Sequence, residues 1–111
     1  MPKGDYLGEF EHLVLLAIAR AGGKSGGADI HAEIEHVSRR GASLPAIYVT
    51  LGRLETKGYV RTSETVPQEG RGGRPRRLFE LTRAGSAALR ATREVLERMW
   101  LDVPTAIRSR R

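Results

Sequence analysis

Two short stretches rich in β-branched and aromatic residues lie in the middle of the chain, with helical patterns on both sides of them. Residues 59–66 and 77–81 have the composition and alternation of strands, and residues 67–75 between them are rich in glycine, proline and arginine. Because glycine and proline do not continue either strand, we predict a two-stranded hairpin with a basic tip. Because this segment is predicted to be a hairpin, the chain lacks the further long helices that a four-helix bundle requires.

Two helices are predicted at the N-terminal end of the chain. Apolar residues within 10–21 recur with helical spacing on more than one face, so this helix is expected to be buried on more than one side. The glycine pair at residues 22–23 ends it, and residues 24–27 continue as a loop. A shorter helix with a narrow apolar stripe then begins near Ala28 and ends at residues 39–41.

The third helix has clear signals at both ends and one apolar face. Ser43 can accept a hydrogen bond from a free backbone N–H, and Pro45 fits the first turn, where its missing donor costs nothing. Lys57 and Gly58 close the helix. We assign four of its apolar residues to the core: Leu44, Ile47, Leu51 and Leu54.

A long amphipathic helix follows the hairpin. Thr82 caps its start, its apolar residues repeat with three-four spacing, and Pro104 ends it. Three helices, a two-stranded β-wing and a long C-terminal helix make a winged helix-turn-helix protein, in the α+β, mainly α class. We place the winged domain at residues 5–82, the C-terminal helix at 83–104 and a basic tail at 105–111.

Length, cysteine content and charge narrow the function. A chain of 111 residues forms one small domain, and the absence of cysteine excludes disulfides and thiolate zinc sites, so a partner subunit is the remaining source of extra stability. The net charge is +6, but residues 1–40 hold five cations and six anions. The excess of positive charge therefore lies in residues 41–111, and it favours binding of a polyanion by that part of the chain. The longest apolar run, residues 13–19, is too short to cross a membrane, and we expect a cytoplasmic protein.

The helix from Ser43 to Lys57 is the expected recognition helix, which directs its N-terminal residues toward base edges in the major groove. Thr50 can hydrogen-bond to a base, and Tyr48 and Arg53 can reach phosphates. Arginines of the hairpin can follow the backbone or enter a narrow minor groove. The residues expected to contact double-stranded DNA are Ser43, Pro45, Ala46, Tyr48, Val49, Thr50, Arg53, Arg71, Gly72, Gly73, Arg74, Arg76 and Arg77.

Three segments together resemble a known family. They are residues 8–18, GEFEHLVLLAI; residues 43–60, SLPAIYVTLGRLETKGYV; and residues 72–85, GGRPRRLFELTRAG. In this order and spacing they resemble the short type of PadR-family transcriptional regulators, over about residues 8–100. Two positions depart from the family: Gly26 stands where an aromatic residue is common, and Pro75 interrupts the usual basic run.

The resemblance implies a homodimer in which the C-terminal helix packs with the first helix of the partner, and repression of nearby genes. It also implies that a hydrophobic or aromatic effector enters near the interface in some members and stacks on an aromatic residue, which Trp100 resembles. The alternative for Trp100 is simple packing in the dimer seam. The expected interface residues are Phe10, Leu13, Leu16, Leu89, Thr92, Leu96, Met99, Trp100 and Val103.

Other functions fit the sequence less well. Two Glu-x-x-His pairs, at residues 9–12 and 33–36, have the spacing of di-metal carboxylate bundles, but the two further long helices are missing, so no metal is expected. The glycines at 70–73 precede neither a helix nor a Gly-Lys-Ser/Thr sequence, so we expect no nucleotide cofactor and no enzyme activity. An RNA-binding or protein-interaction winged helix without operator specificity is the alternative function, because one fold hosts several functions.

Overall fold

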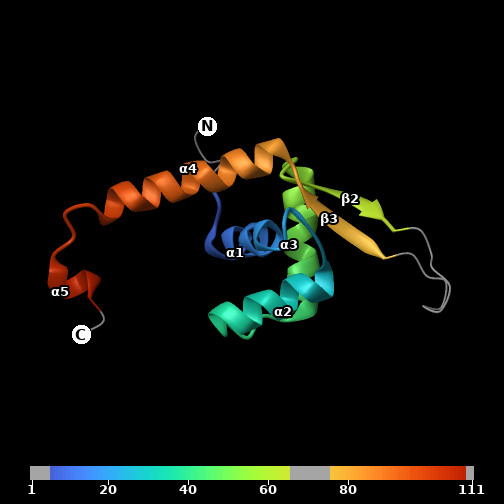
Figure 1. Cartoon of the computed structure of the whole chain (residues 1–111), viewed down its shortest axis with the longest axis horizontal. Helices are drawn as coiled ribbons and strands as arrows, with labels where there is room; N and C mark the ends of the chain where they lie inside the picture. The colour runs from blue at the N-terminus through green and yellow to red at the C-terminus, as the bar shows by residue number, and fades with distance from the viewer. Residues whose placement is uncertain (1–5, 66–75, 110–111) are drawn as a thin grey trace.

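Three helices pack against a small antiparallel sheet, and a long fourth helix runs across one side of them (Figure 1). A computed structural model describes residues 6–65 and 76–109. This arrangement is the predicted winged helix, mainly helical and of the α+β class. Its elements are α1 (Glu9–Arg20), β1 (Lys24–Gly26), α2 (Gly27–Ser38), α3 (Leu44–Thr56), β2 (Val60–Glu64), β3 (Arg77–Leu81), α4 (Arg83–Trp100) and α5 (Thr105–Arg108).

The core lies where α1, α2 and α3 meet the sheet. α1 buries residues on neighbouring faces, as its all-round apolar pattern predicted, and these are Val14, Leu15, Ala17 and Ile18. Ile30 and Ile34 face them from α2, Phe79 from β3 and Val60 from β2. Because strand residues alternate between two faces, Phe79 points into the core while its neighbours along β3 stay more exposed.

The sheet has one strand more than the predicted hairpin. β1, expected as part of a loop, pairs antiparallel with β3, so that Ser25 lies opposite Phe79 and the strand order is β1-β3-β2. The Leu81 N–H extends this ladder by donating to the Gly23 carbonyl over 2.8 Å. β1 pairs here because the edge of β3 that faces away from β2 otherwise leaves backbone N–H and C=O groups without partners.

The C-terminal helix ends earlier than predicted. α4 stops at Trp100, not at Pro104, and Asp102 adopts a positive φ of 64° in the turn that follows. Proline restricts the residue before it to extended backbone, so the helix cannot continue up to Pro104. Pro104 instead precedes the short helix α5, which forms inside the stretch expected to be a basic tail.

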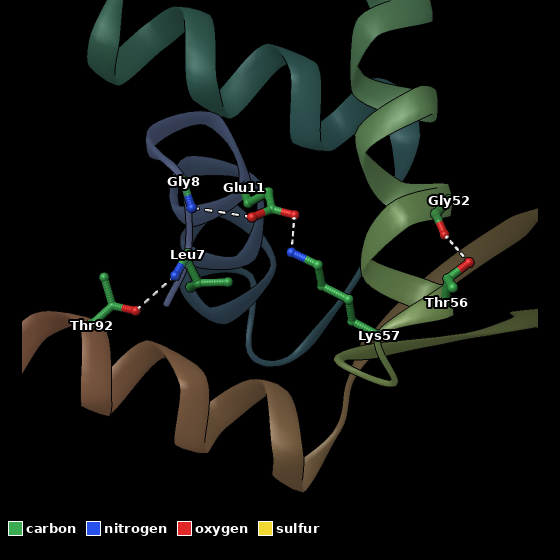
Figure 2. Close-up of polar contacts among 7 residues, drawn as sticks. All are labelled: Leu7, Gly8, Glu11, Gly52, Thr56, Lys57 and Thr92. Atoms are coloured by element: carbon green, nitrogen blue, oxygen red, sulfur yellow. Dashed lines mark hydrogen bonds and ion pairs between the residues drawn. The ribbon is translucent and has the colours of Figure 1, made fainter. Parts of the chain in front are cut away.

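Among the described residues 6–65 and 76–109, α4 is buried against the rest of the chain from its start as far as Thr92. Its buried residues are Gly85, Ala88 and Thr92, and the Thr92 hydroxyl accepts a hydrogen bond of 3.2 Å from the Leu7 N–H (Figure 2). Beyond this point the helix extends away from α1 (Figure 1). Met99 in this second half is 72% exposed.

Candidate nucleic-acid interface

The start of α3 is built as the sequence predicts. Ser43 is the N-cap residue, and its hydroxyl accepts a hydrogen bond of 3.2 Å from the Ala46 N–H. Pro45 lies in the first turn, where no backbone donor is lost to the helix. Ile47, Leu51 and Leu54 are fully buried and hold the helix against the core. The opposite face of α3 is thereby directed outward.

The outward face of α3 carries most of the α3 side chains that were expected to contact DNA. Val49 is 58% exposed, and Ser43, Pro45, Tyr48 and Arg53 are also exposed, whereas Ala46 is half-buried. Arg53 forms no hydrogen bond or ion pair with any residue in 6–65 or 76–109. Gly52 and Thr56 share this face and were missed, although their helical spacing from Val49 places them there.

Two residues of α3 differ from their predicted burial: Thr50 was expected to be exposed and is buried, and Leu44 was expected to be buried and is exposed. Thr50 is only 5% exposed and faces inward, so little of its surface is available for the base contact assigned to it. Thr50 lies three residues after Ile47 and four before Leu54, which places it on the buried face. Leu44, assigned to the core, is 38% exposed because it occupies the first turn, beyond the part of α3 that the core covers.

Tyr48 packs sideways against the wing. Its ring lies 6.1 Å from the ring of Phe79, at an angle of 60°, and its hydroxyl lies over Gly27 at the start of α2. A tilted ring pair of this kind is a favourable aromatic contact. Tyr48 therefore connects α2, α3 and β3, and it presents only part of its ring to a ligand.

The base of the wing is closed by two hydrogen bonds between Thr65 and Arg76. The Arg76 N–H donates to the Thr65 hydroxyl over 2.8 Å, and the Thr65 N–H donates to the Arg76 carbonyl over 2.9 Å. The side chains of Arg76 and Arg77 both point toward carboxylates of the helices, which are Asp29 and Glu55. Four residues of the predicted contact set lie outside the described residues: Arg71, Gly72, Gly73 and Arg74.

A groove of about 780 Å³ lies between the start of α1 and the second half of α3. Glu11 of α1 lies in it and accepts hydrogen bonds from the Lys57 ammonium, over 2.8 Å, and from the Gly8 N–H, over 3.1 Å (Figure 2). Burial raises the pKa of Glu11, but these hydrogen bonds and the charges of Lys57 and Arg53 outweigh it, so the pKa is lowered overall. The groove is lined by Gly8, Phe10, Glu11, Val49, Thr50, Gly52, Arg53, Thr56 and Lys57.

This geometry agrees with the match of the sequence to a family of regulators. Residues 14–91, more than half of the chain, match the model of the transcriptional regulator PadR-like family. The chain belongs to this family. It is therefore a transcriptional regulator with a DNA-binding winged helix, and it is not an enzyme. None of the curated proteins matches the sequence.

Solved structures have the same fold as this PadR-like regulator. A PadR family transcription regulator from Clostridium difficile R20291 has a TM-score of 0.70 at 18% identity, over 83% of this chain and 91% of the other. The winged-helix DNA-binding protein F93 from STIV has a TM-score of 0.71 at 15% identity, over 89% and 99%. The organohalide-sensing regulator RdhR-CbdbA1625, in its 2,4-dichlorophenol-bound form, has a TM-score of 0.68 at 14% identity, over 94% and 57%.

The PadR-like regulator exposes apolar side chains at the end of α4 and on α1. Trp100 is 53% exposed, and the hollow beside it, of about 220 Å³, is lined by Leu96, Met99, Trp100, Val103 and Ile107. A second hollow of about 230 Å³ lies between α1 and α2, with Leu13, Leu16 and Val37 in its wall. Ile107 and Val37 were not among the expected interface residues.

Four of the expected interface residues already have neighbours within the chain, and Leu13 is one of them, because it packs against the core. Thr92 is buried against Leu7, and Leu89 packs on the core, because both lie in the half of α4 that covers the domain. Phe10 is half-buried, with the Arg40 guanidinium 5.1 Å from the centre of its ring. Thr92 is only 5% exposed in the single chain, so its side chain offers little surface to a partner.

No helix in residues 6–65 and 76–109 is long and apolar enough to span a membrane. In the same part of the chain, no group of three or more His, Asp and Glu side chains is arranged to hold a metal ion.

Proposed function

We propose that this PadR-like regulator is a homodimeric, cytoplasmic repressor that binds a near-palindromic operator in double-stranded DNA. The outward face of α3 is the observation on which the proposal rests, because it is exposed and the arginines of the wing lie beside α3. Val49 offers an apolar contact to a base edge, and the free guanidinium of Arg53 can take a phosphate. In a symmetric dimer the two α3 helices enter successive major grooves, about one helical turn apart.

The exposed second half of α4 supports the dimer. Leu96, Met99 and Trp100 form an apolar surface that a soluble monomer would leave in water. The hollow on α1 and α2, with Leu13 and Leu16 in its wall, offers a second apolar surface of similar size. We propose that the end of α4 packs on this part of the partner, and that the association compensates for the small core of a 111-residue chain.

The surroundings of Trp100 support an effector site within this dimer. The hollow beside Trp100 has a volume of about 220 Å³, below the range of about 300–1,000 Å³ that is usual for small-molecule sites. A second copy that covers the hollow would deepen it, and its lining is apolar and aromatic. A hydrophobic or aromatic compound is the ligand that fits such a lining, and RdhR-CbdbA1625 was solved with 2,4-dichlorophenol. Binding there would release the operator.

A fluorescence-anisotropy titration tests the DNA-binding proposal. The ligand is labelled DNA from the region upstream of the regulator's own gene, measured at two salt concentrations with scrambled competitor. Tight, competitor-resistant binding at two protomers per site is expected. Binding that is weak, indifferent to sequence and abolished by salt would contradict the proposal, and would favour the RNA-binding or protein-interaction alternative.

A pair of charge variants tests the dimer by light scattering. Met99→Glu places a charge on the exposed apolar surface of each protomer and is expected to give monomers with weakened operator binding. Arg90→Glu changes an exposed residue of the same helix outside that surface, and is expected to remain dimeric. If the Met99→Glu variant remains dimeric, the dimer interface lies on another surface.

Because Trp100 is the single tryptophan, its fluorescence in a titration with 2,4-dichlorophenol tests the effector site.

A further inference from the structure

The side chain of Arg76 is already occupied by a carboxylate in the DNA-free protein. Its Nη2 atom lies 2.9 Å from Oδ2 of Asp29, which stands in the first turn of α2. Thr65 holds the backbone of Arg76 from the other strand of the wing. The arginine is therefore anchored at its backbone and engaged at its guanidinium group, at the point where the wing meets α2.

A glycine makes room for this contact. A Cβ atom at position 26 would lie 2.9 Å from Nη2 of Arg76 and 3.7 Å from the Arg77 carbonyl oxygen. Gly26 has an ordinary extended backbone, with φ −84° and ψ 161°, so space rather than conformation favours glycine here. The guanidinium group of Arg76 lies against the Gly26 backbone on its way to Asp29.

Arg77, the next residue of the wing, also faces a carboxylate, but at a longer distance than Arg76 does. Nη2 of Arg77 lies 3.9 Å from Oε1 of Glu55 on α3, whose other oxygen accepts the Thr62 hydroxyl over 3.1 Å. Arg53, in contrast, has no hydrogen bond or ion pair with the described residues. Cations on the same surface thus differ in whether a carboxylate is in direct contact with them.

We propose that Asp29 is an electrostatic brake on DNA binding, which acts by competing with a phosphate for Arg76. The inference rests on duplex DNA being the ligand of the α3 and wing surface. A carboxylate and a phosphate bind the same kind of guanidinium donor, so Asp29 competes with a phosphate for Nη2 of Arg76 and its negative charge repels a phosphate nearby. Because this exchange depends on no base, the brake lowers the affinity for every duplex and leaves the preference for the operator unchanged.

The brake also changes the dependence of binding on salt. A phosphate that is neutralised by a free arginine releases a counterion from DNA, which contributes about 0.9 to the slope of log K against log salt. When Arg76 leaves Asp29, the freed carboxylate attracts cations weakly, and this uptake offsets a small part of the release. The wild-type protein is therefore expected to have a shallower slope than a variant without the carboxylate.

The experiment compares Asp29→Asn with wild type and with Glu33→Gln. Glu33 is a matched control because it also lies on α2, and it pairs with Arg20, away from the wing, over 3.5 Å. Anisotropy titrations use a scrambled duplex and the upstream duplex at 50 and 200 mM salt. Asp29→Asn is expected to bind both duplexes more tightly, by about 1.4- to 5-fold per protomer, which is the range expected from the loss of one exposed ion pair. Its advantage over wild type should be smaller at 200 mM than at 50 mM salt, because salt screens the charge of Asp29.

A double-mutant cycle separates the brake from a general loss of negative charge. In an Arg76→Gln background, Asp29→Asn is expected to change the affinity and the slope no more than Glu33→Gln does. The proposal is overturned if Asp29→Asn and Glu33→Gln have equal effects in the wild-type background, or if the gain persists without Arg76. If wild type binds neither duplex at either salt concentration, the proposed function fails as well. Equal thermal unfolding curves for all variants show that helix α2 is intact.

Discussion

Replacing Gly85 by alanine sets two known effects against each other at the point where α4 begins. Alanine is favoured over glycine in a helix by about 1 kcal/mol, so helix preference alone predicts a more stable protein. The packing predicts the reverse. A Cβ atom on Gly85 would overlap the Tyr59 carbonyl oxygen, and it would lie 2.8 Å from Cδ1 of Leu81 and 3.1 Å from the carbonyl carbon of Tyr59.

The carbonyl of Tyr59 cannot easily move away, because it accepts the Thr82 N–H over 3.1 Å. Overpacking in a core costs about 1–3 kcal/mol, and the loss of a backbone hydrogen bond costs about 1 kcal/mol. After the gain in helix preference is subtracted, we expect Gly85→Ala to lower the free energy of unfolding by about 1–3 kcal/mol.

Urea unfolding at one fixed protein concentration measures this change, since the stability of a dimer depends on concentration. Gly52→Ala is the matched control, because it makes the same substitution within helix α3 with no atom within 4 Å of the new carbon. We expect it to raise the free energy of unfolding by about 0.5–1 kcal/mol. If Gly85→Ala is also stabilised, helix preference outweighs packing and the reasoning is refuted.

Three further substitutions test other contacts. Thr92→Val leaves the Leu7 N–H without its buried acceptor and should lower the free energy of unfolding by about 1–3 kcal/mol in urea, whereas Thr92→Ser should retain most of it. Burial lowers the pKa of His12 below 6.5, so the unfolded chain binds the proton of His12 more readily than the folded chain does. The contribution of neutral His12 to the free energy of unfolding should be fully present above pH 6.5 and should be lost as the pH falls from 6.5 through the lowered pKa. His12→Gln should remove this part of the pH dependence. Arg53→Gln should weaken binding to all duplexes and make the salt slope shallower by about 1 per protomer in anisotropy titrations; an unchanged slope would mean that Arg53 contacts no phosphate.

The helices of the winged domain could be predicted because each carries its own local signals. Ser43 and Pro45 mark the start of α3, and the apolar spacing of α1 indicates its burial on neighbouring faces. β1 could not be predicted in the same way. Lys24, Ser25 and Gly26 have no strand-like alternation, and they form a strand only because β3 offers them a free edge.

The helix and the wing that form the candidate DNA-binding surface could be predicted, but the burial and the ion pairs of individual residues could not. Thr50 and Leu44 were placed on the wrong faces because a polar residue was assigned to the surface and a leucine to the core, while the position of each around the helix axis decides otherwise. The pairing of Asp29 with Arg76 joins residues 47 positions apart. Only the folded arrangement of α2 and the wing brings them together.

Because α4 is attached to the domain from its start to Thr92, a small rotation of the helix about this attachment is amplified at its free end. Its contacts end near Thr92, and the remaining residues to Trp100 extend for about 12 Å. A rotation of about 10° at this pivot moves the far end by about 2 Å. In a dimer joined through that end, the same small rotation changes the distance between the two recognition helices. The fit to half-sites one helical turn apart is then set at the Leu7–Thr92 contact, far from any base.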